Sequence, residues 1–120
     1  MGRRGEDSAC AWLESRGHTI LCRNWRAGHL ELDIVSLKDG ALHFVEVKSR
    51  SELAEFEPEN NVTREKRRRL ERAASAFMHS EQEMSGRLVS EVFFDVLAVV
   101  EEDSGCRIEY YPEAFFPLHL

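Results

Sequence analysis

A run of apolar residues in the last third of the chain limits the possible folds more than any other feature. Residues 91–100 read Glu-Val-Phe-Phe-Asp-Val-Leu-Ala-Val-Val, and β-branched and aromatic side chains follow one another there without alternating with polar ones. Such a run is typical of a strand that is buried on both faces within a sheet. Asp95 is the charge inside the run, and because an unpaired buried carboxylate is costly, we expect it to be a structural residue with hydrogen-bond partners.

Other patterns surround this strand with helices and further strands. In order along the chain they predict a helix over residues 3–16, a strand over 18–23, two strands over 31–38 and 41–48, an acidic loop over 49–63, a helix that begins after Thr63, and an edge strand over 107–111 that ends at Pro112. A chain of 120 residues with 42% hydrophobic residues is expected to form one domain, residues 1–120. The expected fold is α/β, with helices flanking a mixed sheet of about five strands in the order α-β-β-β-α-β-β.

The strands 31–38 and 41–48 are joined by a dipeptide that predicts their register. Asp39-Gly40 suits the two positive-φ positions of a type I′ hairpin turn. Continued outward from this turn, the pairing places Val35 opposite Phe44, Asp33 opposite Glu46 and Glu31 opposite Lys48. Because strand side chains alternate between faces, these residues share one face, which is aliphatic near the turn and charged at its far end.

The charged end of this hairpin indicates a metal site. Carboxylates placed opposite each other, as expected for Asp33 and Glu46, repel, and burying them half-paired is costly. A hard divalent cation such as Mg²⁺ resolves this conflict because it takes carboxylate oxygens as ligands and keeps water molecules for a substrate. The alternative is a surface hairpin in which Glu31 and Lys48 form an ordinary cross-strand ion pair.

The charge of the chain is unevenly distributed. The net charge is −6, but residues 64–80 carry six basic and two acidic side chains, so one face can still attract a polyanion. The acidic total disfavours tight, non-specific coating of duplex DNA. No run of eighteen apolar residues is present, and we expect neither a signal peptide nor a membrane span. Three cysteines without Cys-x-x-Cys spacing favour a reducing, cytoplasmic location over a disulfide framework or a zinc site.

Short motifs along almost the whole chain carry a family resemblance. They are Gly5-Glu6-x-x-Ala9, Asn24-Trp25-Arg26, Glu31-x-Asp33, Phe44-Val45-Glu46-Val47-Lys48-x-Arg50, Lys66-x-x-Arg69-Leu70, Phe94-Asp95-Val96 and Ala114-Phe115. An acidic residue on one strand followed by Glu-x-Lys on the next resembles the PD-(D/E)xK nuclease superfamily. The full set resembles the YraN-like family of predicted bacterial endonucleases more closely, although Leu30 stands where that family usually has glycine.

The resemblance implies a restriction-endonuclease-like core and roles for particular residues. It implies that Glu6, Asp33, Glu46 and Lys48 are catalytic, that Asp33, Glu46, the Val47 carbonyl and Glu31 hold Mg²⁺ or Mn²⁺, and that Lys66, Arg69 and Arg50 contact nucleic acid. Arg67 belongs to the same basic run as Lys66 and Arg69, and we expect it to contact nucleic acid as well. The implied reaction is metal-dependent hydrolysis of phosphodiester bonds in DNA, including branched DNA of the Holliday-junction type. Resolvase-like enzymes need two active sites, which would make the protein a homodimer.

Two other function classes fit the same residues. One is a catalytically silent nucleic-acid-binding module that keeps the nuclease fold, which the Leu30 departure and the acidic total favour. It predicts DNA binding that does not depend on Mg²⁺ and that weakens steeply with salt. The other is a protein-interaction domain in which the carboxylates belong to a network of ion pairs, and it predicts no binding to any form of nucleic acid.

Overall fold

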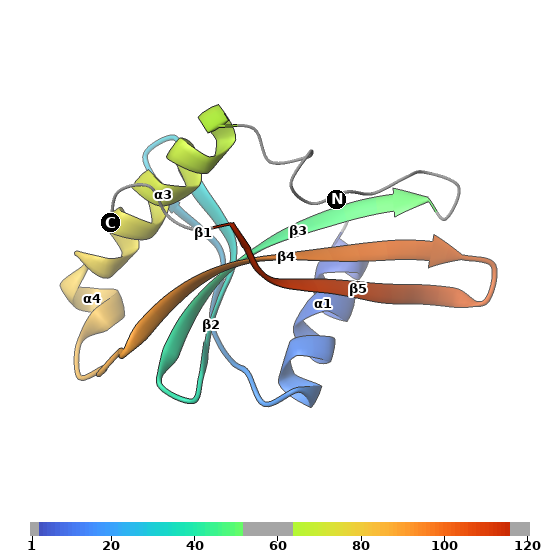
Figure 1. Cartoon of the computed structure of the whole chain (residues 1–120), viewed down its shortest axis with the longest axis horizontal. Helices are drawn as coiled ribbons and strands as arrows, with labels where there is room; N and C mark the ends of the chain where they lie inside the picture. The colour runs from blue at the N-terminus through green and yellow to red at the C-terminus, as the bar shows by residue number, and fades with distance from the viewer. Residues whose placement is uncertain (1–2, 52–63, 116–120) are drawn as a thin grey trace.

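The computed structural model describes residues 3–51 and 64–115, and its elements follow the predicted order (Figure 1). They are α1 (Arg3–Ser15), β1 (Thr19–Ala27), β2 (Leu30–Lys38), β3 (Ala41–Ser51), α3 (Arg64–Met78), α4 (Glu81–Met84), β4 (Glu91–Glu102) and β5 (Gly105–Phe115). The short helix α4 was not expected, and it follows an N-cap at Ser80, whose hydroxyl accepts a hydrogen bond from the Glu83 N–H. Thr63 and most of the predicted acidic loop lie outside the described residues.

The strands form one mixed sheet in the order β1-β2-β3-β4-β5. β3 and β4 are parallel, and the other neighbouring pairs are antiparallel. The parallel pair needs a crossover, which α3 and α4 provide. β4 contains the apolar run and lies between β3 and β5, and residues 94–100 are all buried. The prediction of a mixed five-stranded sheet flanked by helices, with this run inside it, is confirmed.

Each long helix covers a different face of the sheet (Figure 1). The buried stripe of α3, which includes Phe77, packs on Val35 and Phe44. The buried stripe of α1, which includes Leu13, packs on Ile34 and Val45. Neighbouring strand residues therefore enter opposite cores, as the two-residue period of a strand requires. Among the described residues, no helix combines the length and the apolar character needed to cross a bilayer.

The predicted register of the β2–β3 hairpin is confirmed near the turn. Asp39 and Gly40 have φ of 50° and 79°, as a type I′ turn requires, and the strands pair from Lys38–Ala41 as far as Ile34–Val45. Beyond that point β2 pairs with β1 alone, and β3 pairs with β4 alone. Figure 1 shows the start of β2 and the end of β3 running to different sides of the molecule. The direct pairs expected for Asp33 with Glu46 and for Glu31 with Lys48 are thus absent from the ladder, because the two strands separate into a fork.

β2 also exchanges its two faces at Asp33, at the root of this fork. Leu32 packs in the core beneath α3, whereas Ile34 packs in the core beneath α1, although residues two apart normally share a face. β1 changes faces at the same level: Arg23 reaches α1, Trp25 packs on Phe77 of α3, and Asn24 between them has a φ of 52°. The Arg23–Ile34 and Trp25–Leu32 pairs keep one register across this level, so both strands turn over together.

The last strand continues past the proline that was expected to end it. The β4–β5 register shifts between Phe94 and Val96, Glu113 has a φ of 51°, and β5 then extends to Phe115. Proline is tolerated because β5 is an edge strand and the irregularity needs no ladder bond from it. Asp95 lies opposite this irregularity, where its Oδ1 accepts the Glu113 N–H at 2.9 Å.

Asp95 is fully buried and is bonded on its other oxygen as well. His43 Nδ1 lies 2.6 Å from Oδ2, and the Tyr110 hydroxyl donates to the same oxygen. The expectation of a hydrogen-bonded structural aspartate is confirmed.

Candidate functional site

A pocket of about 250 Å³ opens at the fork between β2 and β3, beneath the start of α3. Its walls come from the β1–β2 turn, from both strands and from the helix. The lining residues are His29, Leu30, Glu31, Asp33, Glu46, Lys66, Arg69 and Leu70. The strands thus contribute three carboxylates and the helix contributes two cations, so acidic and basic groups face each other across one concave surface.

Asp33 occupies the space left by the separating strands. Its Oδ2 accepts a hydrogen bond of 2.9 Å from the Val47 N–H, a backbone group beyond the last β2–β3 pair. Burial raises the pKa of the Asp33 carboxyl to about 6, and the nearby Glu46 carboxylate adds to the rise, which the Val47 N–H partly offsets. Asp33 is therefore an acid whose ionised form is disfavoured in the metal-free protein.

The second carboxylate of the site already has a cationic partner. Lys66 Nζ lies 2.7 Å from Glu46 Oε1, and the two side chains are only 29% and 14% exposed. Burial lowers the pKa of Lys48, and the neighbouring Lys66 cation lowers it further. Asp33 and Glu46 act in the opposite direction on Lys48. The structure therefore brings Asp33, Glu46 and Lys48 together, as the sequence predicted, and adds Lys66.

The donor set fits a hard divalent cation. Asp33 and Glu46 offer carboxylate oxygens, and the Val47 carbonyl faces the fork because the N–H and C=O of one strand residue point to the same side. No group of three or more His, Cys, Asp or Glu side chains within residues 3–51 and 64–115 is arranged to hold a metal. Two carboxylates with water and substrate oxygens are nevertheless a common way to bind Mg²⁺. The ion pair between the Lys66 ammonium and the Glu46 carboxylate shows that Glu46 attracts positive charge in this site.

Glu31 lies at the rim of the pocket. Its side chain is 47% exposed, and it pairs with Arg26 of β1 at 3.4 Å, not with Lys48. The alternative of a Glu31–Lys48 ion pair is therefore wrong. The metal-binding role of Glu31 stays a prediction, and only its position beside the pocket supports it.

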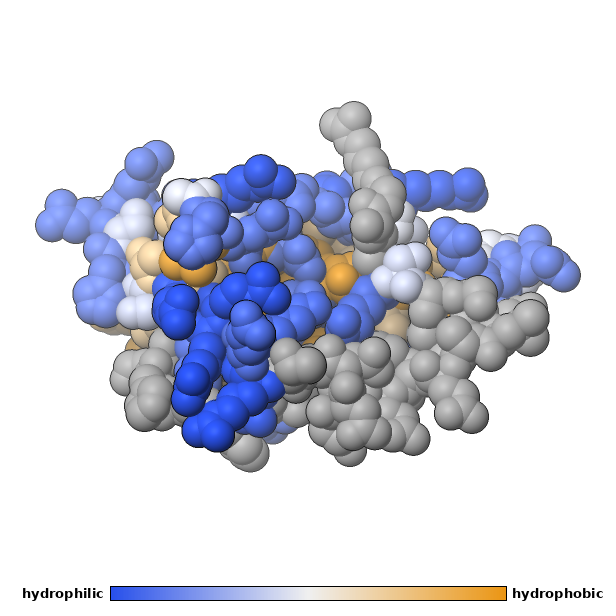
Figure 2. Space-filling model, turned by 90° about the horizontal axis from the view of Figure 1, so that it is seen from above, coloured by the Kyte–Doolittle hydropathy of each residue, from blue (hydrophilic) through white to orange (hydrophobic). Residues whose placement is uncertain are grey.

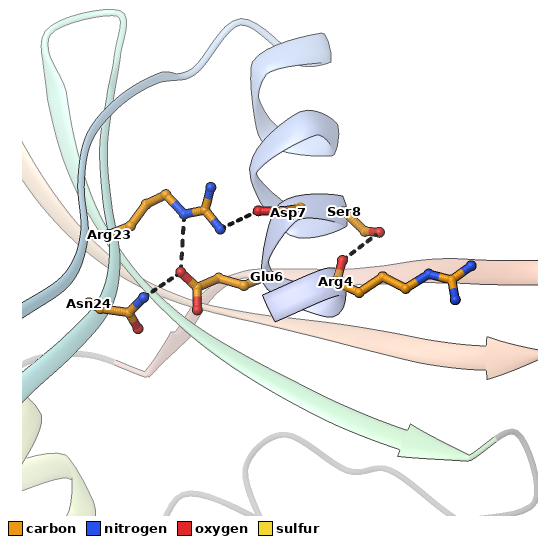
Figure 3. A network of polar contacts seen from close by, with 6 residues as sticks. All are labelled: Arg4, Glu6, Asp7, Ser8, Arg23 and Asn24. Carbon is orange, nitrogen blue, oxygen red and sulfur yellow. Dashed lines mark hydrogen bonds and ion pairs between the residues drawn. The ribbon is translucent and has the colours of Figure 1, made fainter. Parts of the chain in front are cut away.

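Glu6 lies outside the lining of this pocket. It projects from the first turn of α1, where its Oε1 accepts hydrogen bonds from Arg23 Nε at 3.1 Å and from Asn24 Nδ2 at 2.6 Å (Figure 3). Asn24 lies between the residues of β1 that pair with Ile34 and Leu32, the two neighbours of Asp33 in β2. Glu6 is therefore held at the same level along the strands as Asp33, but beside β1. The structure does not bring Glu6 to the other predicted catalytic residues, and its catalytic role stays a prediction.

The predicted nucleic-acid contacts lie at different places. Lys66 and Arg69 line the pocket, whereas Arg67 is half-buried on α3 and outside the lining. Arg50 pairs with Val100 through the β3–β4 ladder, and its side chain lies outside the described residues. The exposed face of α3 carries Arg64, Arg68, Arg69 and Arg72. Seen from above, the side of the molecule that holds α3 is covered by strongly hydrophilic side chains (Figure 2).

Sequence reasoning missed two features of the pocket. His29 and Leu30 form its wall at the β1–β2 turn, where Gly28 has a φ of 61°. Both residues directly precede Glu31 in the sequence, and this position could have indicated that they lie beside the site. Lys66 was expected to contact nucleic acid, and its ion pair with Glu46 depends on how α3 crosses the fork, which no local pattern encodes.

Comparison with known proteins identifies relatives along nearly the whole chain. A model of the family described as "Uncharacterised protein family UPF0102" matches residues 5–99, a span that contains Asp33, Glu46, Lys48 and Lys66. A UPF0102 protein of Bacteroides thetaiotaomicron is 43% identical over 117 residues, which cover 98% of this chain and 93% of the relative. A UPF0102 protein of Anaeromyxobacter dehalogenans is 41% identical over 115 residues, which cover 96% of this chain and 83% of the relative. A UPF0102 protein of Nitratidesulfovibrio vulgaris is 38% identical over 114 residues, which cover 95% of this chain and 82% of the relative. The names of these relatives state the family and no activity.

Proposed function

The chain belongs to the UPF0102 family, the YraN-like family that its motifs resemble, and we propose that it is a metal-dependent endonuclease with a restriction-endonuclease-like core. The proposed reaction is hydrolysis of phosphodiester bonds in DNA, with branched DNA among the substrates. One observation carries the proposal: the fork gathers Asp33 and Glu46 at one pocket whose helical wall is basic, and Lys48 lies close enough to both carboxylates to feel their charge. This combination matches the chemistry of an anionic phosphodiester.

Asp33, Glu46 and the Val47 carbonyl would hold Mg²⁺ or Mn²⁺, which supplies a bound water of lowered pKa and neutralises charge on the phosphate. Lys48 is a half-buried ammonium fixed on β3, and it would orient the attacking water and stabilise the charge that develops on the phosphate. Lys66 and Arg69, on the opposite wall, would hold the DNA backbone by its phosphates.

A second candidate function has one specific observation in its favour. Because Lys66 pairs with Glu46, the charge of that carboxylate is balanced without a metal. A catalytically silent DNA-binding module would keep this arrangement permanently. It would bind DNA through α3 equally well with Mg²⁺ and with a chelator.

Cleavage assays with two variants test the proposed function. We expect Asp33→Asn and Lys48→Ala each to lower the cleavage rate of plasmid and four-way-junction DNA at least about 100-fold in Mg²⁺ or Mn²⁺, because each removes a group that contacts the reacting atoms. Lys38→Ala is the matched control, since Lys38 lies at the other end of β2 beside the hairpin turn. Circular dichroism checks that all three variants fold.

Two outcomes would overturn the assignment. If folded Lys48→Ala cuts DNA as fast as the unmodified chain, Lys48 has no role in the reaction. If the unmodified chain binds DNA with equal affinity in Mg²⁺ and EDTA and cuts no substrate, the silent module is the correct function.

Two further parts of the proposal concern assembly and location. Cutting both strands of a branched substrate needs two active sites, so the active form would be a homodimer, and sedimentation velocity of the purified chain measures this. Cys10, Cys22 and Cys106 are all free, which fits a reducing cytoplasm.

A further inference from the structure

We propose that Lys66 is a built-in counter-cation, which neutralises Glu46 while the site holds no metal and moves to the substrate phosphate when a divalent cation binds. This inference rests on the proposed function and adds a step that couples metal loading to DNA binding. The ion pair between Lys66 Nζ and Glu46 Oε1 at 2.7 Å is its starting point.

The position of Lys66 in α3 explains why the contact is made. Lys66 lies in the first turn of a helix that begins at Arg64, where the helix dipole disfavours positive charge. Its side chain nevertheless reaches into the site and is only 29% exposed. The attraction of Glu46, with Asp33 close by, compensates for this cost. The ammonium therefore lies beside the Glu46 and Asp33 carboxylates, which is also where a divalent cation would bind.

A divalent cation and the Lys66 ammonium cannot both lie beside Lys48 without strong electrostatic repulsion. Lys48 and Lys66 already lie close enough for the positive charge of Lys66 to lower the pKa of Lys48. A divalent cation bound by Asp33 and Glu46 would add two positive charges beside them, in a partly buried site where screening by solvent is weak. One of the two lysines must then move away.

Lys66 is the lysine that can move. Lys48 projects from β3 and is not among the residues that line the pocket, so it has no such open space beside it. Lys66 instead lines the open pocket on a long flexible side chain, beside Arg69 one turn further along α3. Displaced from Glu46, its ammonium would join the Arg69 guanidinium on the wall that faces a bound phosphate.

Such coupling is reciprocal. If Lys66 competes with the metal for Glu46, removing its charge must tighten metal binding, and metal binding must release Lys66. The metal-free site would hold phosphate weakly because its cation is engaged. Binding of DNA would then depend on Mg²⁺ even before any bond is cut.

Titration of Mn²⁺ into DNA-free protein, followed by electron paramagnetic resonance, tests the competition without measuring activity. We expect Lys66→Met to bind Mn²⁺ at least about fivefold more tightly than the unmodified chain, the lower end of ordinary coupling between sites. Lys38→Met is the control, because it removes the same charge from the hairpin end of β2, and its affinity should be unchanged. Equal or weaker Mn²⁺ binding by Lys66→Met would overturn the inference.

A second measurement uses the unmodified chain and needs no variant to fold. Lysines are acetylated with a limiting amount of reagent, with and without saturating Mg²⁺, and the modified peptides are quantified by mass spectrometry. The acetylation rate of Lys66 should rise at least about threefold with Mg²⁺, because its ammonium leaves a carboxylate and becomes accessible, whereas that of Lys38 should stay constant. An unchanged or lower rate at Lys66 would contradict the displacement.

The two proposals fail differently. If the unmodified chain binds Mn²⁺ and cuts DNA while Lys66 shows neither effect, the counter-cation is wrong and the endonuclease stands. If neither the unmodified chain nor Lys66→Met binds Mn²⁺, the metal-dependent function and the inference are both overturned.

Discussion

Asp33 combines three unusual features in one residue. It lies where β2 exchanges its faces, it accepts a hydrogen bond from a strand with which β2 no longer pairs, and its pKa is raised to about 6 by burial and by Glu46. Folding places this carboxylate in surroundings that disfavour its charge. Functional sites often retain a residue of this kind at a cost in stability.

Asp33→Asn should therefore stabilise the metal-free protein at neutral pH while abolishing activity. A carboxyl whose pKa is raised on folding loses stability as pH rises through the interval from about 4 to 6, and asparagine has no such loss. Its side-chain oxygen can still accept the Val47 N–H. We expect the free energy of unfolding in urea to rise by about 1–2 kcal/mol at pH 7.5 and to be unchanged at pH 4.

The exposed Asp103→Asn in the β4–β5 turn is the control for that experiment, with no expected change at either pH. A gain for Asp33→Asn that persists at pH 4 would point to packing, not to charge. A loss at pH 7.5 would show that the ionised carboxylate is well satisfied in the metal-free fold.

The grouping of Asp33 with Glu46 and Lys48 could be predicted from sequence, but for a reason that is only partly correct. Alternation and the Asp39-Gly40 turn give the right register as far as Ile34–Val45. The strands then separate, and Asp33 reaches the site through the change of faces. That change involves the left-handed backbone of Asn24 and the packing of Trp25 under α3, which are tertiary features.

At the scale of elements, α3 serves two purposes with two faces. Leu70, Ala73, Ala74 and Phe77 are buried against the sheet. The outer face carries Arg64, Arg68, Arg69 and Arg72, and Lys66 reaches the fork. The helix thus completes the core with one face and places cations beside the carboxylates with the other.

Arg69→Gln should weaken binding of DNA and make it less sensitive to salt. If Arg69 contacts one phosphate, the slope of the logarithm of affinity against the logarithm of salt concentration should fall in magnitude by about 0.9. Fluorescence anisotropy with labelled duplex and junction DNA in Ca²⁺ measures this slope. The salt concentration is varied from about 50 to about 200 mM. Arg16→Gln, just beyond α1 on the opposite side of the sheet, should leave it unchanged. An unaltered slope for Arg69→Gln would remove this wall of the pocket from the DNA interface.

β5 is an exception to the rule that a proline ends a strand. Pro112 was expected to end the strand, but a register shift beside Asp95 accommodates it, and the strand continues to Phe115. The buried Asp95 carboxylate makes this possible because it takes the Glu113 N–H that the ladder leaves unpaired. Partners of this kind come from distant parts of the chain, and they cannot be inferred from the residues around a proline.

At the scale of the whole molecule, a buried polar network complements the site. His18 Nδ1 bonds Ser36 Oγ at 2.8 Å, the His18 and His43 rings are 4.8 Å apart, and His43 bonds Asp95. The network joins the start of β1 to β2, β3 and β4 on the side of the sheet that α1 covers. Its histidines were scattered in the sequence and gave no sign of this arrangement.

This network should make the protein sensitive to acid. Burial lowers the pKa of His18 to about 4, with His43 and Lys38 acting in the same direction and Asp95 and Asp39 opposing them. Between pH of about 6.5 and 4 the unfolded chain binds a proton at His18 that the folded chain does not, so stability falls as pH falls. We expect the contribution to be about 1–3 kcal/mol.

Urea unfolding at pH 7 and pH 5 measures this effect as the difference between the unmodified chain and His18→Gln. The stability of the variant should depend less on pH over that interval. His79→Gln, an exposed histidine just after α3, is the control and should behave as the unmodified chain. An identical pH dependence for His18→Gln would show that His18 accepts a proton in the folded protein.

The central claim is that the fork between β2 and β3 is a divalent-cation site formed by Asp33 and Glu46. Anomalous diffraction from crystals soaked in Mn²⁺ tests it most directly. We predict an anomalous peak between the two side chains, within about 2.0–2.2 Å of one carboxylate oxygen from each, with Lys66 Nζ withdrawn from Glu46. A fully soaked crystal with no peak at the fork, and with Lys66 still bonded to Glu46, would contradict the account.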